Sequence, residues 1–378
     1  MHIDALAAAA ACHAGPMRRS LAAAMVLAMA IVSGALIARG SEPLDPPLMR
    51  ALATLPDGTL TANFTDWSQV RETVGDTDVS SASPEADRRE ALNAAYEDDL
   101  SAVSGLVGSA RFMVEPYGWS VLDLDWEIFG QARDGAVIVA ELDDAVEPAD
   151  VTAGLADLGY REPDTDADSG GVWQGGPDLL ARLGDTLTPL LEHIAVLADQ
   201  RLVVLSDAPD YAERTVDTIG SESGGMGDLA DVAATATPLF GSITAIVHQP
   251  PRSCVVTSYD SAAPADQELA AARIAEVGEI RAHQGLGFGI RPSERGLDLA
   301  VSMNFETAAI AEAERVPRSE VATGPAIGQG GTYDERFELI DADVIGTDLV
   351  LVLTPVENRM TLVSDLANRP LLFAGCGG

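Results

Sequence analysis

The stretch RLVVLSDAPDYAERTV at 201–216 has a counterpart, DLVLVLTPVENRMTLV, at 348–363. Each begins with a run of apolar residues rich in valine and leucine, which is typical of a buried strand. Each then passes through a short polar turn into a segment with apolar side chains at helical spacing. Both stretches therefore predict a strand followed directly by a helix.

The elements around each stretch follow one order, strand, helix, two strands, helix, strand. In the first copy these elements are expected at 136–142, 147–159, 193–198, 201–206, 209–219 and 242–248, with an inserted hairpin and helix after 159. In the second copy they are expected at 297–305, 306–316, 335–342, 348–354, 356–367 and 370–376. Each copy thus predicts a β-α-β-β-α-β unit.

That order is typical of a ferredoxin-like unit, in which an antiparallel sheet carries two helices on one face. We therefore expect an α+β fold, with an N-terminal membrane-spanning helix followed by two such units and an antiparallel or mixed sheet. One continuous sheet built from both copies is the alternative. Because identities between the copies are few, both an internal duplication and a chance repetition of generic strand–helix units remain open.

Three local patterns complete the expected elements. Residues 59–67, TLTANFTDW, predict a strand leading into a helix capped at Asp66, and the stretch from Ser83-Pro84 to about Ala110 predicts a helix. Residues 119–129 alternate apolar and acidic side chains, which favours a strand with Asp123, Asp125 and Glu127 on its solvated face. Between the two units, 253–260 and 264–282 predict a connecting strand and helix.

The expected organisation has six parts. They are a disordered or misassigned start at 1–16, a signal anchor or signal peptide at 17–40, a tether at 41–60, an N-terminal helical and strand segment at 61–130, a first unit with its insertion at 131–260, and a connecting helix with the second unit at 261–378.

The segment from Leu21 to Ala38 carries no charge and follows Arg18 and Arg19. A helix of about 18 residues covers about 27 Å, close to the hydrocarbon thickness of a bilayer. The arginine pair favours a cytoplasmic N-terminus and an extracytoplasmic C-terminal domain. We expect a single-pass protein of the cell membrane, or a secreted one if the segment is cleaved as a signal peptide.

Charge excludes one class of partner. The chain of 378 residues contains 59 acidic and 23 basic residues, which gives a formal net charge of −36, and it contains no lysine. Binding to phosphate backbones requires a basic surface that releases counterions. A nucleic-acid partner is therefore not expected.

The helix and strand order also resembles that of exported proteins of unknown function from actinobacteria. The resemblance rests on the N-terminal apolar segment, on RLVVLSDAPDYAERTV, and on the helix GDLADVAATATPLF followed by the strand SITAIVH. It covers about a third of the chain and includes no diagnostic motif. It implies an envelope location and a similar architecture, and no particular activity.

The candidates for metal binding are three alternating carboxylates, Asp164, Asp166 and Asp168. They match the first half of a calcium loop, but that loop needs glycine at its sixth position and glutamate at its twelfth, where this chain has Ser169 and Gly175. A solvated hairpin turn is the simpler interpretation. No metal site and no cofactor are predicted.

Cys254 and Cys376 follow the apolar segment, and an even number of cysteines in an oxidising compartment suggests a disulfide. Two buried thiols are the alternative. His248 and Cys254 flank the turn QPPRS, so a cysteine–histidine pair is a further option. The chain lacks the sequence motifs of a nucleophile elbow, a zinc protease helix and a phosphate loop.

These patterns favour a non-catalytic extracytoplasmic binding or interaction module of the bacterial cell envelope. Its partner would be an envelope protein or a small apolar ligand, and the N-terminal helix would hold it at the membrane. The alternatives are an envelope hydrolase with a site assembled from distant residues, and a carrier of an apolar ligand. No catalytic residue is predicted.

Overall fold

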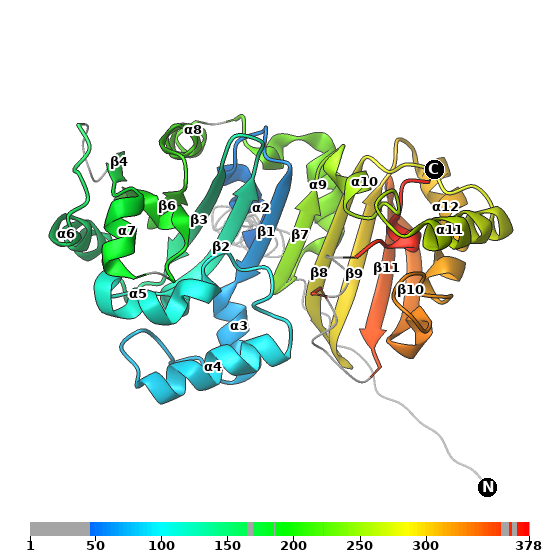
Figure 1. The fold of residues 1–378 in the computed structure, drawn as a ribbon, viewed down its shortest axis with the longest axis horizontal. Helices are drawn as coiled ribbons and strands as arrows, with labels where there is room; N and C mark the ends of the chain where they lie inside the picture. The colour runs from blue at the N-terminus through cyan, green and yellow to red at the C-terminus, as the bar shows by residue number, and fades with distance from the viewer. Residues whose placement is uncertain are drawn as a thin grey trace, which may run out of the picture. The chain divides into compact units, whose positions relative to one another are not determined.

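Eleven strands form one sheet in the computed structural model, which describes residues 46–164, 169–184, 186–221, 223–356, 363–364 and 369–377. The strands are β1 (Thr61–Asp66), β2 (Leu124–Gln131), β3 (Ala136–Leu142), β4 (Ser169–Gln174), β5 (His193–Leu197), β6 (Leu202–Ser206), β7 (Thr244–His248), β8 (Gly285–Ser293), β9 (Gly296–Asn304), β10 (Phe337–Ile345) and β11 (Asp348–Pro355). All neighbouring strands are antiparallel, in the order β10-β11-β9-β8-β7-β1-β2-β3-β6-β5-β4 (Figure 1). The predicted α+β class with an antiparallel sheet is confirmed.

The two halves of the sheet repeat one strand order. In one half β6 lies between β3 and β5, and in the other half β11 lies between β9 and β10. The connection from β9 to β10 passes through one helix, and the connection from β3 to β5 passes through two helices and the strand β4. Each half therefore contains a split β-α-β arrangement. This is the order of the first three strands of a ferredoxin-like unit.

The fourth strand of each predicted unit is absent from its expected place. Next to β3 lies its hairpin partner β2, and next to β9 lies β8. Residues 370–376, expected as a strand, instead contain a short 3₁₀ helix, η9 (Leu372–Ala374). Short hairpins fill the edge that a fourth strand would need, because closing a short loop costs less entropy than closing a long one. The alternative expectation, one continuous sheet built from both copies, is therefore confirmed, and two separate sheets are excluded.

Pairing of β1 with β7 joins the halves, with Thr61 opposite His248 and Thr65 opposite Thr244. Helices cover both faces of the sheet. They are α2 (Pro47–Thr54), α3 (Trp67–Val74), α4 (Glu85–Glu97), α5 (Ala110–Tyr117), α6 (Pro148–Leu158), α7 (Pro177–Leu183), α8 (Pro209–Ile219), α9 (Ala230–Ala236), α10 (Arg252–Val255), α11 (Pro264–Val277) and α12 (Ala308–Ala322). Side chains of α2, α8 and α9 share one core cluster, whereas those of α3 to α7, α11 and α12 share the other.

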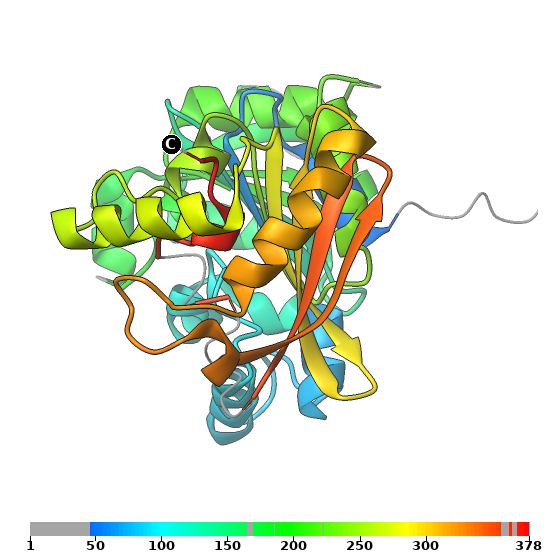
Figure 2. The same cartoon turned by 90° about the vertical axis from the view of Figure 1, so that its right-hand side faces the viewer.

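Glycines of β8 let one helix approach the sheet closely. A Cβ atom on Gly287 would lie 2.6 Å from a methyl carbon of Leu239, and one on Gly285 would meet the side chain of Thr235 on α9. The glycine rhythm at 285–289 therefore serves helix–sheet packing, as expected for a strand of small residues. On the other face, α12 lies across β10 and β11, and α11 packs on α12 (Figure 2).

Several local predictions need correction. The stretch 41–60, interpreted as a tether, contains α2, whose Leu48, Ala51 and Leu52 are buried. The helix expected from Pro84 to about Ala110 ends at Glu97, and 253–260 begins with α10 instead of a strand. β7 already has β1 and β8 as neighbours, so no sheet edge remains beside it for a further strand.

The prediction that the acidic side chains of 119–129 face solvent is also wrong. Glu127 is buried because α3 and the loop before α5 cover this side of β2. Asp123 is buried in a 3₁₀ turn before β2, where the backbone of Ser81 and Ser120 donates hydrogen bonds to it, and Asp125 is partly exposed. The apolar segment 21–38 lies outside the described residues. Among those that are described, no helix combines the length and the apolar character needed to cross a bilayer.

Candidate functional site, an arginine-lined groove

A groove of about 760 Å³ lies between α4 and α5. Five residues of α4 line it, Glu85, Arg88, Arg89, Leu92 and Asn93. Their spacing of three, four, seven and eight residues places them on one face of the helix. The remaining lining comes from α5, from the 3₁₀ turns η1 (Val107–Ser109) and η2 (Val121–Asp123), and from Ser120.

Weak packing of α4 leaves this face available. The helix is rich in charged residues, buries only Ala91 and Ala95, and packs on α3. Helices in globular proteins usually bury a broad apolar stripe. Because the apolar stripe of α4 is narrow, Arg88 and Arg89 lie outside it and line the groove.

Three arginines line the groove, Arg88, Arg89 and Arg111. Nη1 of Arg88 donates hydrogen bonds to the carbonyl oxygens of Ser81 at 2.9 Å and Ser83 at 2.6 Å. The guanidinium carbon of Arg111 lies 4.2 Å from the centre of the Phe112 ring.

None of these three arginines forms an ion pair with a carboxylate in the part of the chain that the structure describes. Eight other arginines there do. The charges of the three groove arginines are therefore available to a ligand.

The groove has a mixed character. Its ionisable side chains are the three arginines and two glutamates, Glu85 and Glu115, so the lining has a small positive balance in a chain of formal charge −36. Leu92, Val107 and Leu122 add apolar surface. Such a lining suits a molecule with an acidic group and an apolar part.

A buried carboxyl supports one wall. Oε1 of Glu127 on β2 accepts a hydrogen bond from the backbone N–H of Gly105 at 2.9 Å, two residues before η1. Burial raises the pKa of Glu127 to about 7, and hydrogen bonds from Ser104 and from the backbone of Gly105 and Leu106 oppose the shift. Glu127 is thus a positioning residue for the loop that leads into the groove wall.

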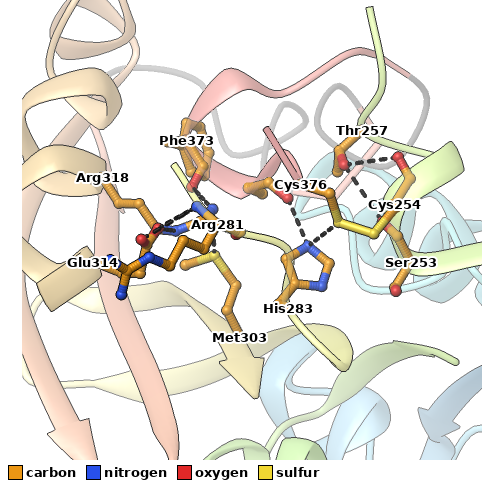
Figure 3. The surroundings of a disulfide bond; sticks show 11 residues. Ser253, Cys254, Thr257, Arg281, His283, Met303, Glu314, Arg318, Phe373 and Cys376 are labelled. Atoms are coloured by element: carbon orange, nitrogen blue, oxygen red, sulfur yellow. Dashed lines mark hydrogen bonds and ion pairs between the residues drawn. A yellow bond between two sulfur atoms is a disulfide. The ribbon is translucent and has the colours of Figure 1, made fainter. Parts of the chain in front are cut away.

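The predicted disulfide is confirmed. Cys254 on α10 and Cys376 are bonded across 122 residues, with their Cα atoms 5.3 Å apart (Figure 3). The alternative of two free thiols is excluded in this structure. The proposed pairing of His248 with Cys254 is replaced by another contact, since Nε2 of His283 lies 3.5 Å from the sulfur of Cys376.

The calcium candidates are only partly described. Asp164 lies in an exposed bend, and Asp166 and Asp168 lie outside the described residues. Arg161 and Gln174 form an antiparallel bridge that closes the segment between them. This is compatible with the hairpin turn.

Three further acidic residues, Asp123, Asp143 and Asp144, form hydrogen bonds or ion pairs within the protein. Asp123 accepts hydrogen bonds from the backbone N–H groups of Ser81 at 2.9 Å and Ser120 at 2.8 Å. Asp143 forms an ion pair with Arg71 at 3.3 Å, whereas Asp144 lies 3.5 Å from Arg201. These contacts hold loops against the sheet.

The three histidines that the structure describes, His193, His248 and His283, are largely enclosed. Burial, together with the nearby charges of Arg252 and Arg318, lowers the pKa values of His248 and His283 to about 3. Burial also lowers the pKa of His193 at the start of β5. Nδ1 of His248 lies 3.0 Å from the hydroxyl of Thr61, and none of the three histidines lines the arginine groove.

The groove was not predicted from the sequence. A usable signal was present, because Arg88, Arg89 and Arg111 stand in segments that otherwise carry mainly acidic charge. Their convergence depends on the placement of α4 relative to α5.

The fold and groove define an α+β domain with an antiparallel sheet and an open ligand-sized groove. No family model matches the chain, and no curated protein matches it. Among solved structures, the structure of crystal form III of TP0453 is similar at a TM-score of 0.38 and 7% sequence identity. The match covers 86% of this chain and 100% of that one, and at this TM-score it carries no argument about function.

Proposed function

We propose that this protein is a non-catalytic, extracytoplasmic binding module of the bacterial cell envelope whose ligand is a small acidic amphiphile. The observation that carries the proposal is the groove between α4 and α5, lined by three arginines without carboxylate partners among the described residues. The expected apolar ligand is thereby refined to one that carries an acidic group.

Guanidinium groups suit this role because their forked donors match carboxylate and phosphate oxygens. Arg88 is held in place by two backbone carbonyls, so little side-chain entropy would be lost on binding. The volume of about 760 Å³ falls in the range of small-molecule sites. The side chains of Leu92 and Leu122 would contact the apolar part of the ligand.

Two observations support the extracytoplasmic location. Disulfides form and persist mainly in oxidising compartments, and Cys254 is bonded to Cys376. The apolar segment after Arg18 and Arg19 favours export of the C-terminal part. Attachment to the membrane through this segment is part of the proposal.

The two halves of the sheet also support an internal duplication. Each half has the same order of three strands around a split β-α-β connection. We infer that one ancestral unit was duplicated and that the copies later diverged in their hairpins and insertions.

Native mass spectrometry of the full chain released from a non-ionic detergent tests the proposed ligand class. Decanoate and decanol serve as probes, because they share an apolar chain and differ in the acidic group. We expect decanoate to bind and decanol to bind much more weakly. A charged hydrogen bond contributes about 1.5–3 kcal/mol, so Arg88→Gln with Arg111→Gln should weaken decanoate binding at least tenfold.

Arg295→Gln is the matched control, since Arg295 is exposed in the turn between β8 and β9 and lies outside the groove. It should bind decanoate as the parent chain does. Equal binding of decanol and decanoate, or an unchanged affinity in the double variant, would refute the proposed ligand class.

A further inference from the structure

An imidazole lies beside the disulfide. Nε2 of His283, which precedes β8, lies 2.9 Å from the carbonyl oxygen of Ala374 and 3.5 Å from Sγ of Cys376 (Figure 3). A carbonyl only accepts hydrogen bonds, so Nε2 carries the proton while the disulfide is intact. The two sulfur atoms and a nitrogen of His283 all lie within 4.8 Å of one another.

One distance in this cluster matches that of a zinc site, whereas the two sulfur atoms would move apart once their bond is reduced. Zinc binds thiolate sulfur at about 2.3 Å and imidazole nitrogen at about 2.0–2.1 Å in a tetrahedral arrangement. Those bond lengths place a ligand sulfur and a ligand nitrogen about 3.5 Å apart. The observed contact between Cys376 and His283 already has this value.

The surroundings leave room for metal entry. Cys254 and Cys376 are partly exposed and line a groove of about 380 Å³, together with Thr257 and Ile274. His283 is buried, and its ring meets that of Phe305 edge to face at 6.5 Å. The imidazole is therefore held in place, and the two cysteine side chains border the groove through which a metal ion could enter.

We propose that Cys254, Cys376 and His283 form a zinc site when the disulfide is reduced. Zinc and the disulfide would then exclude each other, so the oxidised protein would be free of metal at this place. The site lies apart from the arginine groove and does not depend on the proposed ligand.

The chemistry requires a dithiol reductant. The reductant gives two electrons and two protons to the Cys254–Cys376 bond, which becomes two thiols while the reductant becomes a disulfide. Zinc then displaces both thiol protons, and the proton on Nε2 of His283 moves to Nδ1. The zinc charge is balanced by two thiolates, and two protons are released to solvent.

A metal titration of the full chain tests the site. The reduced chain is titrated with Co²⁺ as a spectroscopic probe and then with Zn²⁺ in competition. We expect one metal ion per chain, a thiolate-to-cobalt charge-transfer absorption, and loss of that absorption as zinc displaces cobalt. The oxidised chain should show no such absorption.

The His283→Gln variant should bind zinc at least tenfold more weakly. The control is His193→Gln, which replaces a histidine on β5 and should leave the affinity for zinc unchanged. Alkylation of the unaltered chain provides a second measurement that does not require a variant to fold. Zinc should protect Cys254 and Cys376 of the reduced chain from alkylation. Equal alkylation with and without zinc, or an unchanged affinity in a folded His283→Gln chain, would overturn the proposal.

Discussion

Replacing Glu127 with glutamine should remove a pH-dependent loss of stability. The carboxyl is fully buried, and its pKa is raised from 4.5 to about 7, chiefly by burial. Below about pH 4.5 the group is protonated in both the folded and the unfolded chain, so its stabilising contribution is fully present. That contribution is lost as the pH rises through about 7, because the unfolded chain then releases the proton more easily.

The magnitude follows from the shift. At 1.36 kcal/mol per pKa unit, the difference between 4.5 and about 7 corresponds to about 3 kcal/mol of unfolding free energy. Glutamine has nearly the same shape, keeps an acceptor for the Gly105 N–H, and does not ionise. Glu127→Gln should therefore be more stable than the parent chain by about 3 kcal/mol above neutral pH, and nearly equal to it near pH 4.5.

Urea unfolding, followed by circular dichroism at several pH values between about 4 and 9, measures this difference. Glu338→Gln is the control, because Glu338 is exposed on the edge strand β10. That variant should keep the pH dependence of the parent chain. If Glu127→Gln also kept this pH dependence, the carboxyl of Glu127 would not be its cause.

Two further predictions concern the second half of the sheet. Cys254→Ser with Cys376→Ser removes a crosslink across 122 residues, and chain entropy predicts a loss of about 5 kcal/mol in unfolding free energy. Urea unfolding of this variant should match that of the reduced, metal-free parent chain, and a loss below about 1 kcal/mol would show that other contacts hold residues 371–377. Arg318→Met leaves the buried charge of Glu314, 2.9 Å away, without its ion-pair partner and the carbonyl oxygens of Arg281 and Phe373 without a donor, and it should cost about 3–5 kcal/mol of unfolding free energy. Adding Glu314→Leu removes the unpaired charge and should restore part of that stability, and failure of this rescue would argue against the charge explanation.

The spacing of apolar residues along the sequence was enough to predict many of the strands and helices. The strands β3, β5, β6, β9 and β11 and the helices α6, α8 and α12 occur where apolar runs and helical spacing of apolar residues placed them. This succeeds because side chains repeat every two residues along a strand and about every 3.6 residues along a helix. The cysteine count likewise predicted the bond between Cys254 and Cys376.

Errors arose where a residue's environment comes from distant parts of the chain. Glu127 stands in a stretch where acidic and apolar residues alternate, which is the pattern of a strand with one solvated face. In the folded protein, Trp67 and the loop at Gly105 cover it. The candidate groove was missed for the same reason, since Arg88 and Arg111 belong to different helices. Nothing in the spacing of these arginines shows that the two helices face a common space.

The fold class and most of the strand and helix order were thus predictable from the residues themselves, because they depend on neighbours within a few positions. The joining of the halves through β1 and β7, the burial of Glu127, the approach of His283 to Cys376 and the convergence of the groove arginines were settled by tertiary packing. Each of these contacts links segments far apart in the chain. Their free energy depends on which surfaces are buried together, which no local pattern specifies.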